Sequence, residues 1–237
     1  MDLLKRMKPL VNRIGMSYVS LLCRREYATQ RFTGINERPI ELSFLFRQLT
    51  RLWPQTVLDV GTGVTALPHL MRTCGFMVTA IDNVRDYWPS GMVNRHYHVI
   101  NDDITAPRLR ETFDFISCIS VLEHIRAHDA AVRSMLSLLN PGGHLLLTFP
   151  YHEERYVENV YLLPGAGVTD IPPFITQVFS RREVDGWLRA NGGTLCEQEY
   201  WRFFEGEFWT FGNRVTPPRQ VGRDEPHQVS CLLIRKG

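Results

Sequence analysis

The sequence lacks the cysteine pattern of a disulfide framework or of a zinc site. Its five cysteines are an odd number, and no two of them have a C-x-x-C spacing. Cys118 and Cys231 lie within apolar runs, where a thiol behaves as a small buried hydrophobic group. We therefore expect no bound metal, and reduced thiols of this kind are typical of a cytoplasmic protein.

A strong excess of one charge is also missing. The chain has 27 Lys and Arg against 25 Asp and Glu, which gives a formal net charge of +2. This balance does not favour a nucleic-acid partner. No segment approaches the roughly 20 apolar residues of a membrane span. The basic start of the chain, residues 1–10, is interpreted as a solvated helix face in preference to a membrane contact.

The sequence does contain a repeated alternation of short apolar runs with segments of helical spacing. Residues 1–38 predict an N-terminal helical extension or lid, and a single domain follows over residues 39–237. The predicted strands are the runs at 56–60, 76–81, 96–100, 113–119, 144–149, 194–204 and 229–235. Residues 205–228 are expected to form a loop or lid. The pattern predicts an α/β fold in which helices cover both faces of a mostly parallel sheet.

A glycine turn follows the first predicted strand. Asp59 lies within that strand, and Gly61-Thr62-Gly63 comes directly after it. In open parallel sheets, ligands bind beyond the carboxyl ends of the strands, and glycine allows a ligand to approach the backbone. Asp82 ends the second strand, where a carboxylate can accept hydrogen bonds from both hydroxyls of a ribose. Nicotinamide-dependent enzymes and methyltransferases share these features.

Later motifs favour a methyltransferase. Asp103-Ile104 follows the third predicted strand, where a carboxylate can accept from an exocyclic adenine amine. Residues 113–125 run through the fourth strand into its loop, and Pro141-Gly142-Gly143 comes before the fifth strand. Taken in order, these motifs resemble those of the class I, Rossmann-like S-adenosylmethionine-dependent methyltransferases, and the resemblance covers about residues 40–150.

The resemblance implies a fold, a cofactor and a set of binding residues. The fold is a seven-stranded sheet of order 3-2-1-4-5-7-6 with its last strand antiparallel, flanked by helices as a three-layer sandwich. The cofactor is S-adenosyl-L-methionine. The residues expected to bind it are Asp59, Gly61, Thr62, Gly63, Asp82, Asn83, Asp103, Ile104 and Ser120. Thr65 stands where many members of the family have a third glycine.

The catalytic base is left open between two histidines. His124 follows the fourth strand, and its intrinsic pKa suits proton transfer near neutral pH. Glu123 could orient His124 or cap the next helix, and the Glu-His pair could instead be architectural. His152, just after the fifth strand, is the second candidate.

The methyl acceptor is expected to be a small molecule or a carbohydrate-type group that offers a hydroxyl or an amine. Its pocket should come from segments outside the common core, which are residues 1–38, 151–179 and 203–228. These segments carry many aromatic side chains that could stack on a ring. Two other functions stay open, a nicotinamide-dependent oxidoreductase and a non-catalytic relative that binds the cofactor. The oligomeric state is not defined by the sequence.

Overall fold

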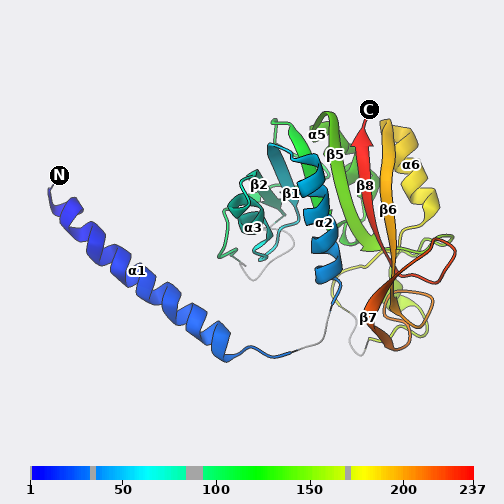
Figure 1. Ribbon diagram of the computed structural model, residues 1–237, viewed down its shortest axis with the longest axis horizontal. Helices are drawn as coiled ribbons and strands as arrows, with labels where there is room; N and C mark the ends of the chain where they lie inside the picture. The colour runs from blue at the N-terminus through cyan, green and yellow to red at the C-terminus, as the bar shows by residue number, and fades with distance from the viewer. Residues whose placement is uncertain (1, 33–35, 84–92, 169–171) are drawn as a thin grey trace. The chain divides into compact units, whose positions relative to one another are not determined.

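The computed structural model describes residues 2–32, 36–83, 93–168 and 172–237, and the chain divides into two units (Figure 1). The first unit, residues 1–36, contains helix α1 (Asp2–Ala28). The second unit, residues 37–237, contains the sheet and all other helices described. Among the described helices, none is both long enough and apolar enough to cross a membrane.

The second unit is built on one sheet of eight strands. Their order is β3-β2-β1-β4-β5-β8-β6-β7. The bounds are β1 (Thr56–Val60), β2 (Met77–Asp82), β3 (Ile100–Asn101), β4 (Phe113–Ile119), β5 (Leu139–Pro150), β6 (Gly193–Phe204), β7 (Arg214–Val221) and β8 (Val229–Lys236). The first five strands pair in parallel, whereas β8 is antiparallel to β5 and β6, and β7 is antiparallel to β6. The predicted strand order is therefore confirmed, with β7 added at the edge.

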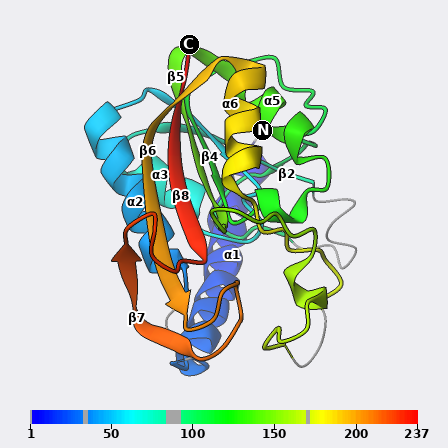
Figure 2. The same ribbon diagram turned by 90° about the vertical axis from the view of Figure 1, so that its right-hand side faces the viewer.

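Helices cover both faces of this sheet (Figures 1 and 2). They are α2 (Arg38–Leu52), α3 (Leu67–Thr73), α5 (His128–Leu138) and α6 (Arg181–Asn191), with short 3-10 turns η1 (Leu122–His124) and η2 (Val160–Leu162). One apolar cluster joins α5 and α6 to Leu145 and Leu147 of β5. Another joins α2 and α3 to Leu146. Successive residues of the central strand thus serve opposite faces, which explains its unbroken apolar run.

The main correction concerns residues 205–228, which were expected to form only a loop or lid. Arg214–Val221 is strand β7, paired antiparallel with β6. Its apolar signal is weak because most of its residues are exposed or half-buried. Pro217 and Pro218 are tolerated because an edge strand does not need every backbone N–H for pairing.

Other strand boundaries also differ from the prediction. β3 is limited to Ile100–Asn101, whereas residues 96–100 were predicted. β5 starts at Leu139, earlier than predicted. Residues Asn140-Pro141-Gly142-Gly143 lie within the strand and form a bulge, and β5 pairs with β4 in a different register on each side of it. The predicted capping box of α6 is present, with Ser180 and Glu183 bonding reciprocally.

Candidate active site

The carboxyl ends of neighbouring strands bring most of the predicted cofactor-binding residues to one edge of the sheet. Strands β3, β2, β1 and β4 lie side by side in that order. Asp59 lies in β1 and Asp82 ends β2, while Asn83 follows β2 as a half-buried residue. Asp103 follows β3, and Ser120 follows β4. Parallel pairing therefore gathers these positions as the sequence predicted.

Asp59 braces the glycine turn from inside the protein. Its side chain is buried, and its two carboxylate oxygens accept from Thr62 Oγ1 at 2.7 Å and from Ser117 Oγ at 2.8 Å. The Gly61 N–H donates to the Ile81 carbonyl at 2.9 Å, which ties the turn to β2. Burial raises the pKa of Asp59 to about 6. Both of these hydrogen bonds lie inside the protein, so Asp59 holds the turn in shape.

The two glycines of the turn meet different surroundings. Gly61 has φ +75°, and a Cβ there would lie 2.4 Å from the Val121 methyl groups. Gly63 has φ +55°, and among the described residues its Cβ would meet Asp82 Oδ2 alone, at 3.9 Å. The Gly63 N–H donates to that same carboxylate oxygen at 2.6 Å. Bare backbone beside a strand-end carboxylate fits the ribose end of an adenosyl group.

Thr65, at the position of the missing third glycine, fits into the turn. Its hydroxyl donates to the Thr62 carbonyl at 2.9 Å. Asn94 contacts the same turn through its side-chain amide, which donates to the Gly63 and Thr65 carbonyls at 2.9 Å each. The sequence analysis missed Asn94, because an isolated asparagine in a loop gives no signal of the backbone that it contacts.

The two acidic residues after β3, Asp102 and Asp103, have different surroundings. Asp102 is buried and accepts from Arg108 through both backbone and side chain, so these hydrogen bonds hold its pKa below the usual range despite burial. Asp103 is exposed, and its Oδ1 accepts from the Thr105 N–H and hydroxyl. Ile104 is buried in the core. Of these, Asp103 presents its carboxylate to solvent at the sheet edge.

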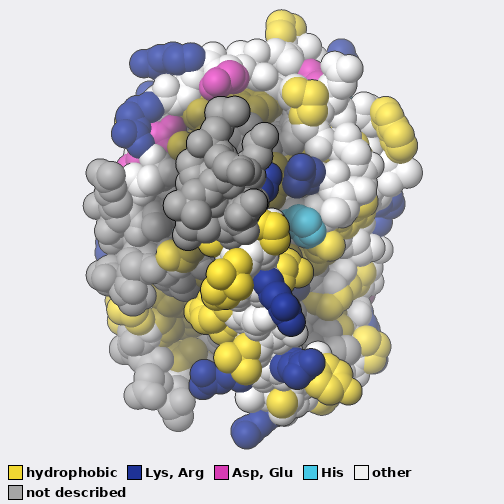
Figure 3. All heavy atoms as spheres, turned by 90° about the vertical axis from the view of Figure 1, so that its left-hand side faces the viewer, with side chains coloured by type: hydrophobic (Ala, Val, Ile, Leu, Met, Phe, Trp, Pro, Cys, Tyr) yellow, Lys and Arg dark blue, Asp and Glu magenta, His cyan; other side chains and the backbone are white. Residues whose placement is uncertain are grey.

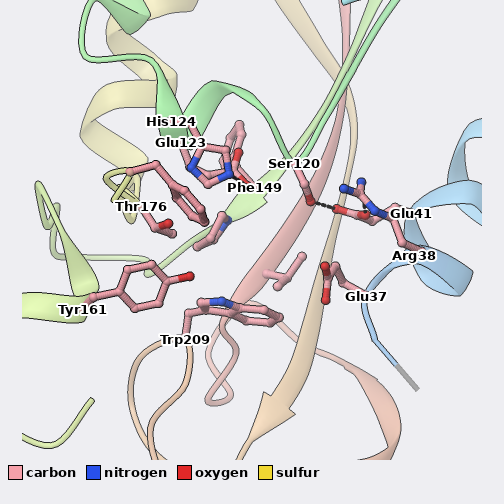
Figure 4. A pocket seen from close by; sticks show the side chains of 13 residues that line it. Glu37, Arg38, Glu41, Ser120, Glu123, His124, Phe149, Tyr161, Thr176 and Trp209 are labelled. Atoms are coloured by element: carbon pink, nitrogen blue, oxygen red, sulfur yellow. Dashed lines mark hydrogen bonds and ion pairs between the residues drawn. The ribbon is translucent and has the colours of Figure 1, made fainter. Parts of the chain in front are cut away.

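A cavity of about 200 Å³ opens next to Ser120 (Figure 4). Residues from the start of α2, from η1, from the ends of β4 and β5, from η2, from the residues before α6, from the segment between β6 and β7 and from the start of β8 surround it. They are Glu37, Arg38, Glu41, Ser120, Glu123, His124, Phe149, Pro150, Tyr161, Phe174, Thr176, Trp209 and Val229. Tyr161, Phe174 and Trp209 form an aromatic side, Glu37, Arg38 and Glu41 gather on the side of α2, and Glu123 lies beside His124 (Figure 4). Segments 151–179 and 203–228, from which the sequence analysis expects the acceptor pocket, contribute Tyr161, Phe174, Thr176 and Trp209 to it.

Glu41 is a second residue that the sequence analysis missed. It is fully buried, and its Oε1 accepts from Ser120 Oγ at 2.5 Å and from Thr148 Oγ1 at 2.6 Å. Its Oε2 accepts from Arg38 at 3.1 Å, and the Arg38 guanidinium also donates to the Ile119 carbonyl. Burial raises the pKa of Glu41. Glu41 therefore ties α2 to the ends of β4 and β5 at the cavity wall.

His124 enters the same cavity with a defined orientation. Its Nδ1 lies 2.7 Å from the Ile175 carbonyl, which can only accept, so Nδ1 carries the proton. Nε2 is left as a proton acceptor, 3.9 Å from Glu123 Oε1. Burial lowers the pKa of His124. The ring also packs edge-on against Phe174, with centroids 4.9 Å apart.

Glu123 is a buried acid at the inner end of this cavity. Burial raises the pKa of Glu123 well above its usual value, and the nearby Glu41 carboxylate acts in the same direction. Its Oε2 has no hydrogen-bond partner among the described residues. Gln177 fixes the backbone here, because its N–H donates to the Glu123 carbonyl and its Nε2 to the Ile125 carbonyl, both at 2.9 Å.

The structure does not bring His152 to this cavity. Its Nδ1 accepts from the backbone N–H groups of Glu154 and Arg155, at 3.1 Å each. The remaining nitrogen, Nε2, then carries the proton and lies 3.3 Å from Glu207. His152 is absent from the residues that line the cavity in the described part of the chain. Of the two candidate bases, only His124 thus combines a cavity position with an unprotonated nitrogen.

Comparison with known proteins agrees with this geometry. Residues 27–198 match the sequence model of the methyltransferase domain family. The chain belongs to this family. The ubiquinone biosynthesis O-methyltransferase of Pseudomonas fluorescens is 28% identical over 153 residues, which cover 59% of this chain and 64% of that protein. The enzyme of the same name from Coxiella burnetii is 26% identical over 173 residues, covering 67% and 71% respectively.

Solved structures of methyltransferases share the fold. TehB from Haemophilus influenzae superposes with a TM-score of 0.54 at 18% identity, covering 90% of this chain and 65% of that one. The N-methyltransferase NodS from Bradyrhizobium japonicum, in complex with S-adenosylhomocysteine, gives 0.53 at 17% identity, covering 90% and 95%. The predicted class I methyltransferase family is therefore confirmed, and the nicotinamide-dependent alternative is not supported. The chain spans less than two thirds of the Pseudomonas relative.

Proposed function

We propose that this member of the methyltransferase family transfers the methyl group of S-adenosyl-L-methionine to a hydroxyl of a small ring-containing acceptor. The observation that carries the proposal is the orientation of His124. The Ile175 carbonyl holds the proton on Nδ1, so that Nε2 is available as a base inside the cavity. The curated relatives are named as O-methyltransferases, which supports oxygen as the acceptor atom.

The sheet edge would hold the cofactor. Asp82 would accept from the ribose hydroxyls, beside the open backbone of Gly63. Asp103 and Ile104 would meet the adenine. Next to Ser120, the Arg38 guanidinium supplies a positive charge complementary to the methionine carboxylate. When bound, the cofactor supplies an electrophilic methyl group on a sulfonium sulfur.

The chain's own chemistry is then proton removal and alignment. As the acceptor oxygen attacks the methyl carbon, His124 Nε2 takes the hydroxyl proton. The lowered pKa of His124 keeps its ring neutral, and therefore basic, at pH 7. The raised pKa of Glu123 favours the protonated form of that neighbouring carboxyl, in which it carries no negative charge to draw a second proton onto the imidazole. With an acceptor bound, the aromatic side chains of the cavity would shield the reacting atoms from water.

The cavity also indicates the shape of the acceptor. Phe149, Tyr161, Phe174 and Trp209 line one side, and a flat ring or the apolar face of a sugar can stack on such a wall. A phenolic hydroxyl has a pKa of about 10, which makes its proton removable by a neutral imidazole during attack. Small phenols and catechols are therefore the first acceptors to test, with sugars and amines as comparison classes.

The test is a turnover measurement on His124→Asn, with His152→Asn as the matched control. We expect His124→Asn to lower kcat by about 10² or more, and His152→Asn to change it by roughly threefold at most. The kcat/KM of the unmodified protein should rise with pH through a pKa below 6.5 and then level off, and this limb should vanish in His124→Asn. Both variants should keep the rise in melting temperature that S-adenosylhomocysteine causes.

Three outcomes would contradict the proposal. One is full turnover by His124→Asn. Another is activity on amines with none on hydroxyl acceptors. The third is cofactor binding without turnover of any acceptor, which would instead support a non-catalytic relative.

A further inference from the structure

Glu41 is a buried carboxylate that joins three separate parts of the cavity wall. Acidic side chains usually stay at the surface, like those coloured in Figure 3, whereas Glu41 is fully buried. It lies in the first turn of α2 and contacts Arg38 of the same turn, Ser120 after β4 and Thr148 within β5. An apolar side chain at such a position often stabilises a fold as well as a buried ion pair does. The carboxylate therefore indicates a function beyond packing.

Ser120 has a backbone conformation that non-glycine residues rarely adopt. Its φ is +48°, in the left-handed region. Its N–H donates to the carbonyl and to the hydroxyl of Thr148, at 3.1 and 3.0 Å, and its own hydroxyl donates to Glu41 Oε1. The Thr148 hydroxyl donates to the same Glu41 oxygen at 2.6 Å. Glu41 thus completes the network that holds this strained turn, and strain of this kind is commonest at functional sites.

Glu41 also orders the guanidinium of Arg38. Nη1 of Arg38 donates to Glu41 Oε2 at 3.1 Å and to the Ile119 carbonyl at 3.3 Å. Figure 4 shows the Arg38 guanidinium and the Ser120 hydroxyl beside the Glu41 carboxylate. Burial raises the pKa of Glu41, but the Arg38 charge and the Ser120 and Thr148 hydroxyls lower it and so favour the carboxylate. A long arginine side chain otherwise samples many rotamers, and ordering it when a ligand binds weakens that binding. Holding the guanidinium on Glu41 removes part of this cost.

We propose that Glu41 is a positioning residue for the methionine end of S-adenosyl-L-methionine. It acts through Arg38 and the Ser120 turn, which it holds in the arrangement that receives the carboxylate of this group. All three residues line the cavity. This role rests on the proposed pairing of Arg38 with the methionine carboxylate, and it does not depend on His124 or on the methyl acceptor.

The experiment compares two ligands that differ at their methionine end. S-adenosylhomocysteine carries the amino-acid group, whereas 5′-methylthioadenosine has the same adenosine thioether without it. Their dissociation constants are measured by isothermal titration calorimetry with the full chain and with Glu41→Gln. A glutamine amide oxygen can still accept from the two hydroxyls, but the amide N–H groups cannot accept from Arg38. We expect Glu41→Gln to bind S-adenosylhomocysteine about tenfold more weakly, and to bind 5′-methylthioadenosine with a change of about twofold at most.

Gln48→Leu is the matched control. Gln48 lies about two turns further along the same face of α2 and is also fully buried. Neither polar atom of its side chain has a hydrogen-bond partner among the described residues, and Gln48 is not one of the described residues that line the cavity. Gln48→Leu should therefore change the dissociation constant of either ligand by about twofold at most.

Two further variants test whether Glu41 acts through its two partners. Arg38→Gln removes the guanidinium and should weaken S-adenosylhomocysteine binding at least as much as Glu41→Gln does. Because Glu41 acts largely through Arg38, adding Glu41→Gln to Arg38→Gln should cost a further threefold or so, about threefold at most. Ser120→Ala keeps both charges but removes one donor to Glu41, so it should weaken S-adenosylhomocysteine binding by about threefold and leave 5′-methylthioadenosine binding unchanged. Ser120→Ala carries the test if Glu41→Gln does not fold.

Four results would overturn the proposal. Equal weakening of both ligands by Glu41→Gln would assign Glu41 a purely structural role. The others are an unchanged affinity of Glu41→Gln for S-adenosylhomocysteine, losses that add in full in the double variant, and an unmodified protein that binds 5′-methylthioadenosine but not S-adenosylhomocysteine. These are binding measurements, so they stand whatever the turnover of His124→Asn shows, and the roles proposed for Glu41 and for His124 can fail separately.

Discussion

Gly61 allows a quantitative test of how the glycine turn is packed. In Gly61→Ala, the added methyl would lie 2.4 Å from two methyl groups of Val121, far inside van der Waals contact. Overpacking of this kind costs about 1–3 kcal/mol. The backbone also has φ +75°, and alanine in that conformation costs about 1 kcal/mol more. We therefore expect Gly61→Ala to lower the free energy of unfolding by about 2–4 kcal/mol.

Two further single variants separate the cost of the collision with Val121 from the cost of the backbone conformation. Gly63→Ala has a similar backbone penalty at φ +55°, but within the described part of the chain its methyl group would meet nothing closer than 3.9 Å. It should cost about 1 kcal/mol in stability, while weakening S-adenosylhomocysteine binding because the open backbone is covered. Val121→Ala removes the methyl groups with which Gly61→Ala collides. The double variant should therefore be more stable than the sum of the single losses predicts, by about 1–2 kcal/mol.

The assay is urea unfolding of all four variants, followed by circular dichroism and checked by thermal melting. For a chain of this size, each kcal/mol corresponds to roughly 2–4 °C in melting temperature. If Gly61→Ala is as stable as Gly63→Ala, or if its effect adds to that of Val121→Ala without coupling, then Val121 does not pack against the turn as described. The argument from the Cβ contact would then be refuted.

Two other substitutions test buried polar groups by urea unfolding. The folded pKa of Asp59, about 6, exceeds the value of about 3.9 in an unfolded chain, so its contribution to stability is present below about pH 4 and is lost as pH rises through 6. As the pH rises from 4 to 7, the free energy of unfolding of Asp59→Asn should therefore increase by roughly 3 kcal/mol relative to that of the unmodified protein. A difference between the two proteins that does not change with pH would contradict the raised pKa of the buried Asp59 carboxyl. Ser180→Ala removes the capping box with Glu183 and should cost about 1 kcal/mol at any pH in this range; no measurable loss would show that the cap is dispensable.

Much of the fold follows from local sequence patterns. The apolar runs predicted the central strands because residues buried on both faces of a parallel sheet must be apolar at every position, as in Leu145–Leu147. β7 was missed for the opposite reason. An exposed edge strand needs no apolar alternation, so Pro217 and Pro218 could be read only as a loop.

The sequence could predict those candidate site residues whose positions depend on the backbone of one short segment. Gly61, Gly63 and Asp82 could be identified because a strand, a turn and the end of the next strand leave a recognisable spacing. Glu41 could not, because a glutamate within a helical segment usually faces water, and only contact with Ser120 and Thr148 makes it a buried residue of the cavity wall.

The sequence by itself determined the alternation of strands and helices, because short-range periodicity encodes it, and its motifs identified the family, whose resemblance implied the strand order. Only the tertiary structure shows how the surroundings of the two histidines differ. The Ile175 carbonyl, distant along the chain, leaves Nε2 of His124 open in the cavity, whereas the neighbouring backbone and the distant Glu207 hold His152 away from it. Hydrogen-bond partners of this kind leave no periodic trace in the order of the amino acids.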